Sequence, residues 1–75
     1  MRLNINLSQT KMSNMTIDVE PKNTVEDVIT LITVKNNYID FDRATLYFNK
    51  EILPRNKKLS DCNIQDDYTL VLVER

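Results

Sequence analysis

The 75 residues contain no glycine, no histidine and no tryptophan, and only one cysteine. Without histidine the chain cannot build a Ser-His or Cys-His catalytic pair, and a single cysteine cannot make a zinc site. A lone cysteine also cannot close a disulfide within the chain, so folding does not depend on an oxidising compartment. The lack of glycine excludes a glycine-rich phosphate loop. We therefore expect no enzyme, no cofactor and no metal.

Turns that would normally use glycine must be built from other residues. Asparagine tolerates positive φ better than most residues do. Five asparagines lie where turns are expected, and we predict that they replace glycine there: Asn36, Asn37, Asn49, Asn56 and Asn63.

The formal net charge is −1 and the pI is about 5.2, which argues against a general nucleic-acid binder. The N-terminus has no apolar run long enough for a signal peptide or a membrane span. We expect a monomer in the cytoplasm or nucleus, away from membranes. A chain of this length builds one compact core, so residues 1–75 should form one domain.

Apolar and polar residues alternate over residues 1–7 and 15–20, which predicts two strands joined by a hairpin over residues 8–14. Pro21 should end the pairing because it has no N–H to donate. Thr24 should cap a helix, with Glu26 and Asp27 near the positive end of its dipole. The spacing predicts one buried helix face, with Leu31 and Val34 away from it: Val25, Val28, Ile29 and Ile32.

The second half of the chain predicts three more strands, over residues 46–48, 52–53 and 69–74. Residues 54–58 should form a basic loop, followed by a short turn in which Ser60 serves as N-cap. We expect Ile39 below the helix and Cys62 as a small, half-buried filler. The pattern alone indicates a small α+β protein.

Several segments, in this order, resemble the ubiquitin family. They include Met1-Arg2-Leu3-Asn4-Ile5, Thr24-Val25-Glu26-Asp27-Val28, Leu46-Tyr47-Phe48-Asn49, Leu59-Ser60-Asp61, Asn63-Ile64-Gln65 and Thr69-Leu70. The resemblance covers nearly the whole chain. It implies a β-grasp fold of class α+β, in which a mixed five-stranded sheet packs on one helix and the last strand lies beside the first.

The last strand is apolar at four successive positions, 70–73, whereas a strand with one wet face should alternate. If Leu70 and Leu72 point at the helix, then Tyr47, Val71 and Val73 form an apolar patch on the outer face. The resemblance implies that this surface binds proteins. Tyr47 stands in place of a central isoleucine, and we place Thr45, Lys50 and Arg75 at the rim of the surface.

The resemblance implies a domain that docks a larger protein onto ubiquitin receptors, proteasome subunits or other ubiquitin-binding domains. We expect it not to be conjugated, because conjugation in this family uses a C-terminal diglycine and the residues contain no glycine. Glu51 and Asp66 also stand where family members carry chain-forming lysines. A modifier whose diglycine tail is missing is the alternative, and a structural scaffold module is a third possibility.

A basic group near Tyr47 is open to two interpretations besides a solvated loop. It could form a rim for an acidic partner or, with the aromatic ring, a nucleic-acid contact. The group consists of Lys50, Arg55, Lys57 and Lys58. Asp61, Asp66 and Asp67 lack the ligand spacing of a calcium loop, and we expect them to be solvated.

Overall fold

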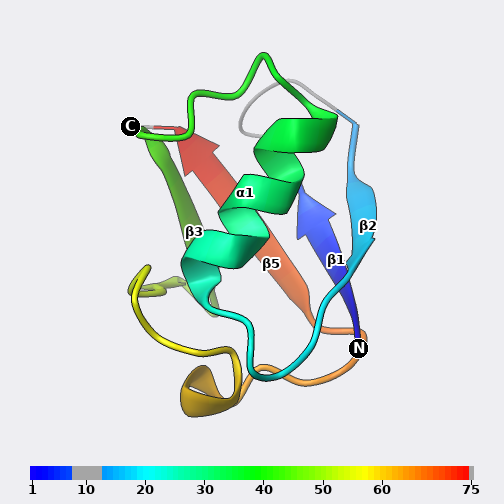
Figure 1. Cartoon of the computed structure of the whole chain (residues 1–75), viewed down its shortest axis with the longest axis vertical. Coiled ribbons are helices and arrows are strands. Elements are labelled where there is room, and N and C mark those ends of the chain that lie inside the picture. The colour runs from blue at the N-terminus through cyan, green and yellow to red at the C-terminus, as the bar shows by residue number, and fades with distance from the viewer. Residues whose placement is uncertain (8–12, 75) are drawn as a thin grey trace.

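The computed structural model describes residues 1–7 and 13–74, and its elements follow the predicted order (Figure 1). One helix crosses a sheet of five strands, so the predicted α+β fold is confirmed. The predicted hairpin turn lies mostly outside the described residues, because positions 8–12 belong to it. The elements are β1 (Arg2–Asn6), β2 (Met15–Asp18), α1 (Val25–Lys35), β3 (Ala44–Phe48), β4 (Glu51–Ile52), the 3-10 turn η2 (Ser60–Cys62) and β5 (Thr69–Glu74).

The sheet has the strand order β2-β1-β5-β3-β4. β1 and β5 run parallel, with Ile5 opposite Leu70, and the other neighbouring strands are antiparallel. The sheet is therefore mixed, and its central pair comes from the two ends of the chain, as Figure 1 shows. The predicted position of the last strand beside the first is confirmed.

The core lies between the sheet and α1. Leu3, Ile5, Leu70 and Leu72 are fully buried on the inner face of the sheet, as period-two alternation predicted. The predicted helix face is also buried, and Ile39 lies below it at 4% exposure. Phe48 and Cys62 are among the half-buried side chains that pack against this core.

Helix α1 starts where the sequence predicted. The Asp27 N–H donates to Thr24 Oγ1 at 3.1 Å, and the Thr24 N–H donates to Asp27 Oδ2 at 3.0 Å. These two bonds form a capping box, which satisfies two N–H groups at the helix start. The next N–H groups, of Val25 and Glu26, donate to the carbonyls of Lys57 and Arg55 at 2.9 and 3.0 Å. The predicted basic loop therefore also holds the helix N-terminus.

The prediction that Ser60 caps its turn is wrong. Ser60 is the first residue of η2, the N-cap is Leu59, and no side chain caps the turn. Backbone bonds to an earlier loop hold it instead, because the N–H groups of Leu59 and Ser60 donate to the carbonyls of Asn23 and Pro21. These long-range bonds replace the local cap that the sequence suggested.

The turn prediction is correct only in part. Asn49 and Asn63 have positive φ, of 51° and 58°, as expected for residues that replace glycine. Lys50 and Asp67 also have positive φ, of 68° and 66°. Aspartate tolerates this region much as asparagine does, whereas lysine has no such preference. Among the described residues no other position has positive φ, so the remaining three asparagines do not serve in this way.

Candidate protein-docking surface

Tyr47, Val71 and Val73 lie together on the sheet face opposite the helix. Tyr47 pairs directly with Val71 across β3 and β5, and Thr45 pairs with Val73 two residues along. All four side chains are half-buried. Thr45 therefore lies beside Val73 on this face.

Ile52 extends this surface onto β4, and the sequence prediction missed it. Its partner in the sheet is Tyr47, and it is 49% exposed. The sequence predicts one short strand of Ile52 and Leu53, whereas β4 is Glu51–Ile52 and Leu53 turns into the core at 8% exposure. Adjacent side chains in a strand point to opposite faces, so Ile52 is exposed while Leu53 is buried. This alternation could have predicted Ile52 as part of the surface.

We name the resulting surface the docking face. It consists of Thr45, Tyr47, Ile52, Val71 and Val73. Tyr47 lies at its centre, because Val71 pairs with it on one side and Ile52 on the other. Aromatic and aliphatic side chains on adjacent strands bury more apolar area in a partner than scattered ones can.

The other half of the same sheet face is polar. A shallow hollow of about 240 Å³ lies there over β1 and β2. Its polar groups are bonded within the chain: Asn4 Nδ2 donates to the Asp67 carbonyl at 3.0 Å, and Asn14 Oδ1 accepts from the Leu7 N–H at 3.0 Å. The hollow is lined by Asn4, Ile5, Asn6, Asn14, Met15, Thr16 and Thr69. The apolar half gains more from burial than this hydrated half does.

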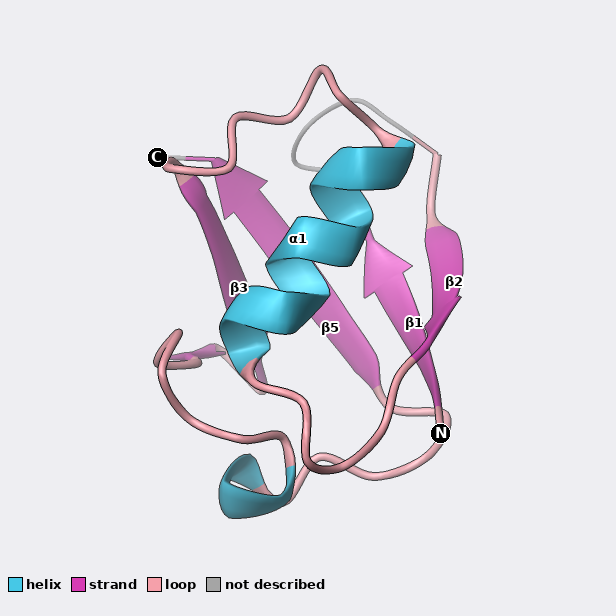
Figure 2. Cartoon of the chain, viewed as in Figure 1, coloured by secondary structure: helices cyan, strands magenta, loops and turns pink. Residues whose placement is uncertain are grey.

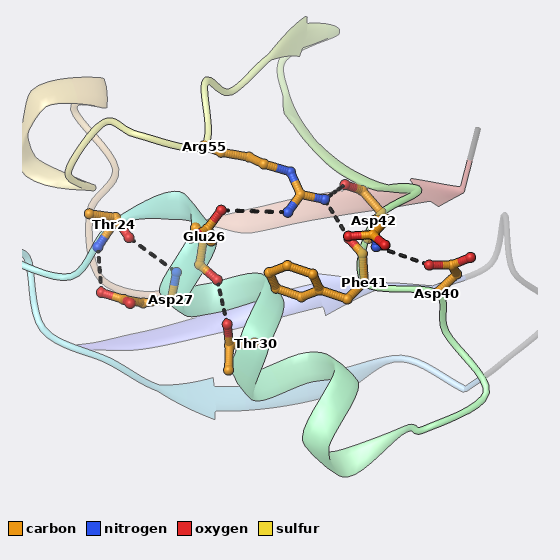
Figure 3. A network of polar contacts seen from close by, with 9 residues as sticks. Thr24, Glu26, Asp27, Thr30, Asp40, Phe41, Asp42 and Arg55 are labelled. Atoms are coloured by element: carbon orange, nitrogen blue, oxygen red, sulfur yellow. Dashed lines mark hydrogen bonds and ion pairs between the residues drawn. The ribbon is translucent and has the colours of Figure 1, made fainter.

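The predicted basic group does not exist as a unit, because Arg55 turns inward (Figure 3). Its Nη2 donates to the carbonyls of Phe41 and Ala44, the latter at 2.7 Å. Its Nη1 lies 3.8 Å from Glu26 Oε2, and its guanidinium lies 4.8 Å from the centre of the Phe41 ring. Arg55 therefore joins α1 to the start of β3.

No pattern in the sequence predicts this role of Arg55. The partners of Arg55 are main-chain carbonyls in a loop that is distant along the chain. Every residue has a main-chain carbonyl, so the residue types do not show which ones bind Arg55. With Arg55 withdrawn, Lys50, Lys57 and Lys58 remain as exposed lysines.

A comparison with protein-family models matches residues 3–75 to the Ubiquitin family. The chain belongs to the ubiquitin family. The mixed sheet with one helix is accordingly a ubiquitin-like β-grasp. Domains of this family are generally non-enzymatic modules that mediate contacts between proteins. No curated protein matches the chain.

Of the other two residues predicted at the rim, one lies in the described part of this ubiquitin-family domain. Lys50 is exposed in the turn between β3 and β4, next to the strands that carry Tyr47 and Ile52. Arg75 lies outside the described residues. A flexible lysine at this edge adds charge without covering the apolar centre.

Within residues 1–7 and 13–74, no group of three or more His, Cys, Asp or Glu side chains could hold a metal ion. Over the same residues, α1 is the one α-helix, and no helix is long and apolar enough to cross a membrane. Asp66, predicted to be solvated, accepts a hydrogen bond from the Arg2 N–H at 2.6 Å. The docking face is therefore the surface on which we base a function.

Proposed function

We propose that residues 1–75 act as a single ubiquitin-like domain that binds another protein through the docking face and is not itself conjugated. The observation that carries this proposal is the direct pairing of Tyr47 with Val71 on one side and Ile52 on the other. Three large apolar side chains on three strands form one continuous surface there. A chain that bound nothing would gain little from keeping them together on its solvent face.

The expected contact is small and weak. Tyr47 is the natural anchor, because a rigid aromatic ring buries a large area at low entropy cost and often dominates binding energy. The five residues of the docking face provide less area than a stable interface needs, which is about 1,200 to 2,000 Å² in total. The domain would therefore dock transiently.

The partners that we propose are proteins that recognise ubiquitin-like folds. They include ubiquitin receptors, proteasome subunits and isolated ubiquitin-binding domains, and the domain would bring a larger parent protein to them in the cytoplasm or nucleus. Lys50 at the rim would favour an acidic partner and make association sensitive to salt.

A ubiquitin-like modifier is the second candidate. The residues contain no glycine, so attachment through a diglycine would need residues that follow Arg75. Asp66 stands where the family resemblance implies a chain-forming lysine, and a carboxylate has no amine that could accept an isopeptide bond. Reading the gene beyond position 75 separates the candidates. A diglycine close to Arg75 favours the modifier, and further domains favour the docking module.

Binding can be tested by NMR titration with proteasomal ubiquitin receptors and with ubiquitin-interacting helices. Shifts should cluster on Tyr47, Val71 and Ile52, and Tyr47→Ala should weaken binding by about 5- to 30-fold without unfolding the domain. Thr16→Ala, on the polar half of the same face, is the matched control and should bind normally. The proposal fails if millimolar receptor moves no signal, or moves only residues 55–58.

A further inference from the structure

The side of α1 that faces away from the sheet carries apolar residues where a solvent-facing helix surface is normally charged. Val34 is 75% exposed, Leu31 is 38% exposed, and Tyr38, just after the helix, is 86% exposed. We name these three residues the helix stripe. Figure 2 shows α1 in front of the sheet, and in that view no described element passes over it. The helix stripe and the docking face therefore lie on opposite sides of the molecule.

The hydroxyl groups of the two exposed-side threonines of α1 already donate hydrogen bonds within the helix. Thr30 Oγ1 donates to the Glu26 carbonyl at 3.0 Å, a bond drawn in Figure 3, and Thr33 Oγ1 donates to the Thr30 carbonyl at 3.0 Å. Each hydroxyl donor is satisfied within the helix, so covering it leaves no donor unpaired. Residues 28–34 contain no charged side chain at all. Burying this side of the helix therefore carries a low desolvation cost.

Charges of opposite sign lie at the two ends of this neutral stretch. Asp27 and Lys35 are each four residues from Leu31, so all three lie along one side of α1. Both charged residues are exposed, and among the described residues Lys35 forms no ion pair. If two copies of the chain meet antiparallel with Leu31 at the centre, Asp27 of each copy faces Lys35 of the other. A pattern that complements itself in this way is what a two-fold contact requires.

We propose that a second copy of this chain packs antiparallel on α1 and forms a weak two-fold dimer through the helix stripe. The antiparallel arrangement also opposes the two helix dipoles, which is favourable. One helix face provides less than the roughly 1,200 Å² typical of stable interfaces, so the dimer forms only at high concentration. At lower concentration the chain would be the monomer that the sequence predicts.

The dimer would have a consequence for docking. Because the sheet separates α1 from the docking face, each copy keeps its docking face uncovered. Two such faces on one particle raise the effective affinity for a partner that carries two recognition elements. The dimer itself does not depend on the docking proposal and is tested without a receptor.

The test is sedimentation analysis and concentration-dependent NMR of the protein, from micromolar to millimolar. Wild type should shift toward dimer, with changes at Leu31, Val34 and Lys35. Val34→Glu should raise the dimer dissociation constant at least about 10-fold, which is 1.4 kcal/mol. Thr16→Glu places the same charge on the opposite side of the molecule and should leave the dimer intact. Thermal unfolding of each variant verifies that the fold is kept.

The charge pattern needs its own variants. Lys35→Glu should weaken the dimer as strongly as Val34→Glu does, Lys35→Arg should retain it, and added salt should weaken wild type. Lys22→Glu is the matched control, because it makes the same charge reversal in a turn away from the helix stripe. A single species at every concentration overturns the proposal. A dimer that survives both Val34→Glu and Lys35→Glu also overturns it, and loss with Tyr47→Ala would then place the contact on the docking face.

Discussion

Leu70 and Val71 are neighbours in β5, but their side chains lie on opposite faces of the sheet. Leu70 is fully buried under α1, whereas Val71 is half-buried on the docking face. Leu70→Ala should therefore lower the free energy of unfolding by roughly 2–5 kcal/mol, because it removes packed methyl groups and leaves a cavity. Val71→Ala should cost much less. A urea titration measures both, and equal small losses would mean that the faces are assigned incorrectly.

The same contrast explains which residues could be predicted. Period two placed Tyr47, Val71 and Val73 on the outer face, because strand geometry alone decides this. It could not place Arg55, whose partners are carbonyls brought close by tertiary folding. Nor could it predict the positive φ of Lys50, since lysine has no intrinsic preference for that conformation.

Arg55 provides the second prediction at this scale. Arg55→Ala removes hydrogen bonds from a charged group to the carbonyls of Phe41 and Ala44, each worth about 1.5–3 kcal/mol at most. Because the side chain is 31% exposed, we expect a total loss of only about 2–3 kcal/mol in thermal or urea unfolding. Arg55→Lys should not restore stability, since an ammonium group cannot reach both carbonyls in the same geometry. Lys57→Ala, within about 0.5 kcal/mol of wild type, is the control. If Lys57→Ala lowers the free energy of unfolding as much as Arg55→Ala does, the hydrogen bonds of Arg55 are not the cause of the loss.

At the scale of the element, α1 depends on its cap and its buried face more than on its composition. Seven of its 11 residues are Val, Ile or Thr, which lower helix propensity. The helix forms because four of its side chains are fully buried and because Thr24 and Asp27 bond to each other's main chain.

The third prediction concerns this cap. Thr24→Ala removes the oxygen that accepts the Asp27 N–H and should cost about 1 kcal/mol of stability. Thr24→Ser keeps an acceptor at the same place and should cost less. The measurement is chemical denaturation with circular dichroism. A silent Thr24→Ala beside a damaging Asn23→Ala would move the helix start, although Asn23 Oδ1 also holds the preceding turn through the Glu20 N–H.

Element boundaries were predicted less well than element types. The strand expected over residues 52–53 is Glu51–Ile52, and the cap expected at Ser60 does not form. The first error is a shift of one residue, and the Leu53 N–H still donates to the Leu46 carbonyl on the neighbouring strand. The second arises because a distant partner holds the turn, since the Ser60 N–H donates to the Pro21 carbonyl. A local pattern carries no information about such bonds.

At the scale of the whole molecule, the order of strands is the property that a pattern cannot supply. Period two assigns each side chain to a face but does not say which strands are neighbours. The parallel pairing of β1 with β5 joins residues 4–6 to residues 69–71, almost the full length of the chain apart. Resemblance to the ubiquitin family provided this topology, and the family match over residues 3–75 agrees with it.

The topology leads to the last prediction, which concerns how stability is distributed. β1 and β5 each pair on both sides, whereas β4 has two residues at the edge of the sheet. Amides in β1 and β5 should exchange with solvent only when the whole molecule unfolds, because freeing them breaks the central pairing. Those of Glu51 and Ile52 should exchange through local opening, orders of magnitude faster. Native-state hydrogen exchange followed by NMR resolves the two groups.

If the amide of Ile52 exchanged as slowly as that of Leu70, β4 would belong to the same cooperative unit as the centre. The docking face would then be rigid across all three of its strands. If Ile52 exchanges early, Tyr47 and Val71 form the rigid part of the docking face, and β4 is the part that adapts to a partner.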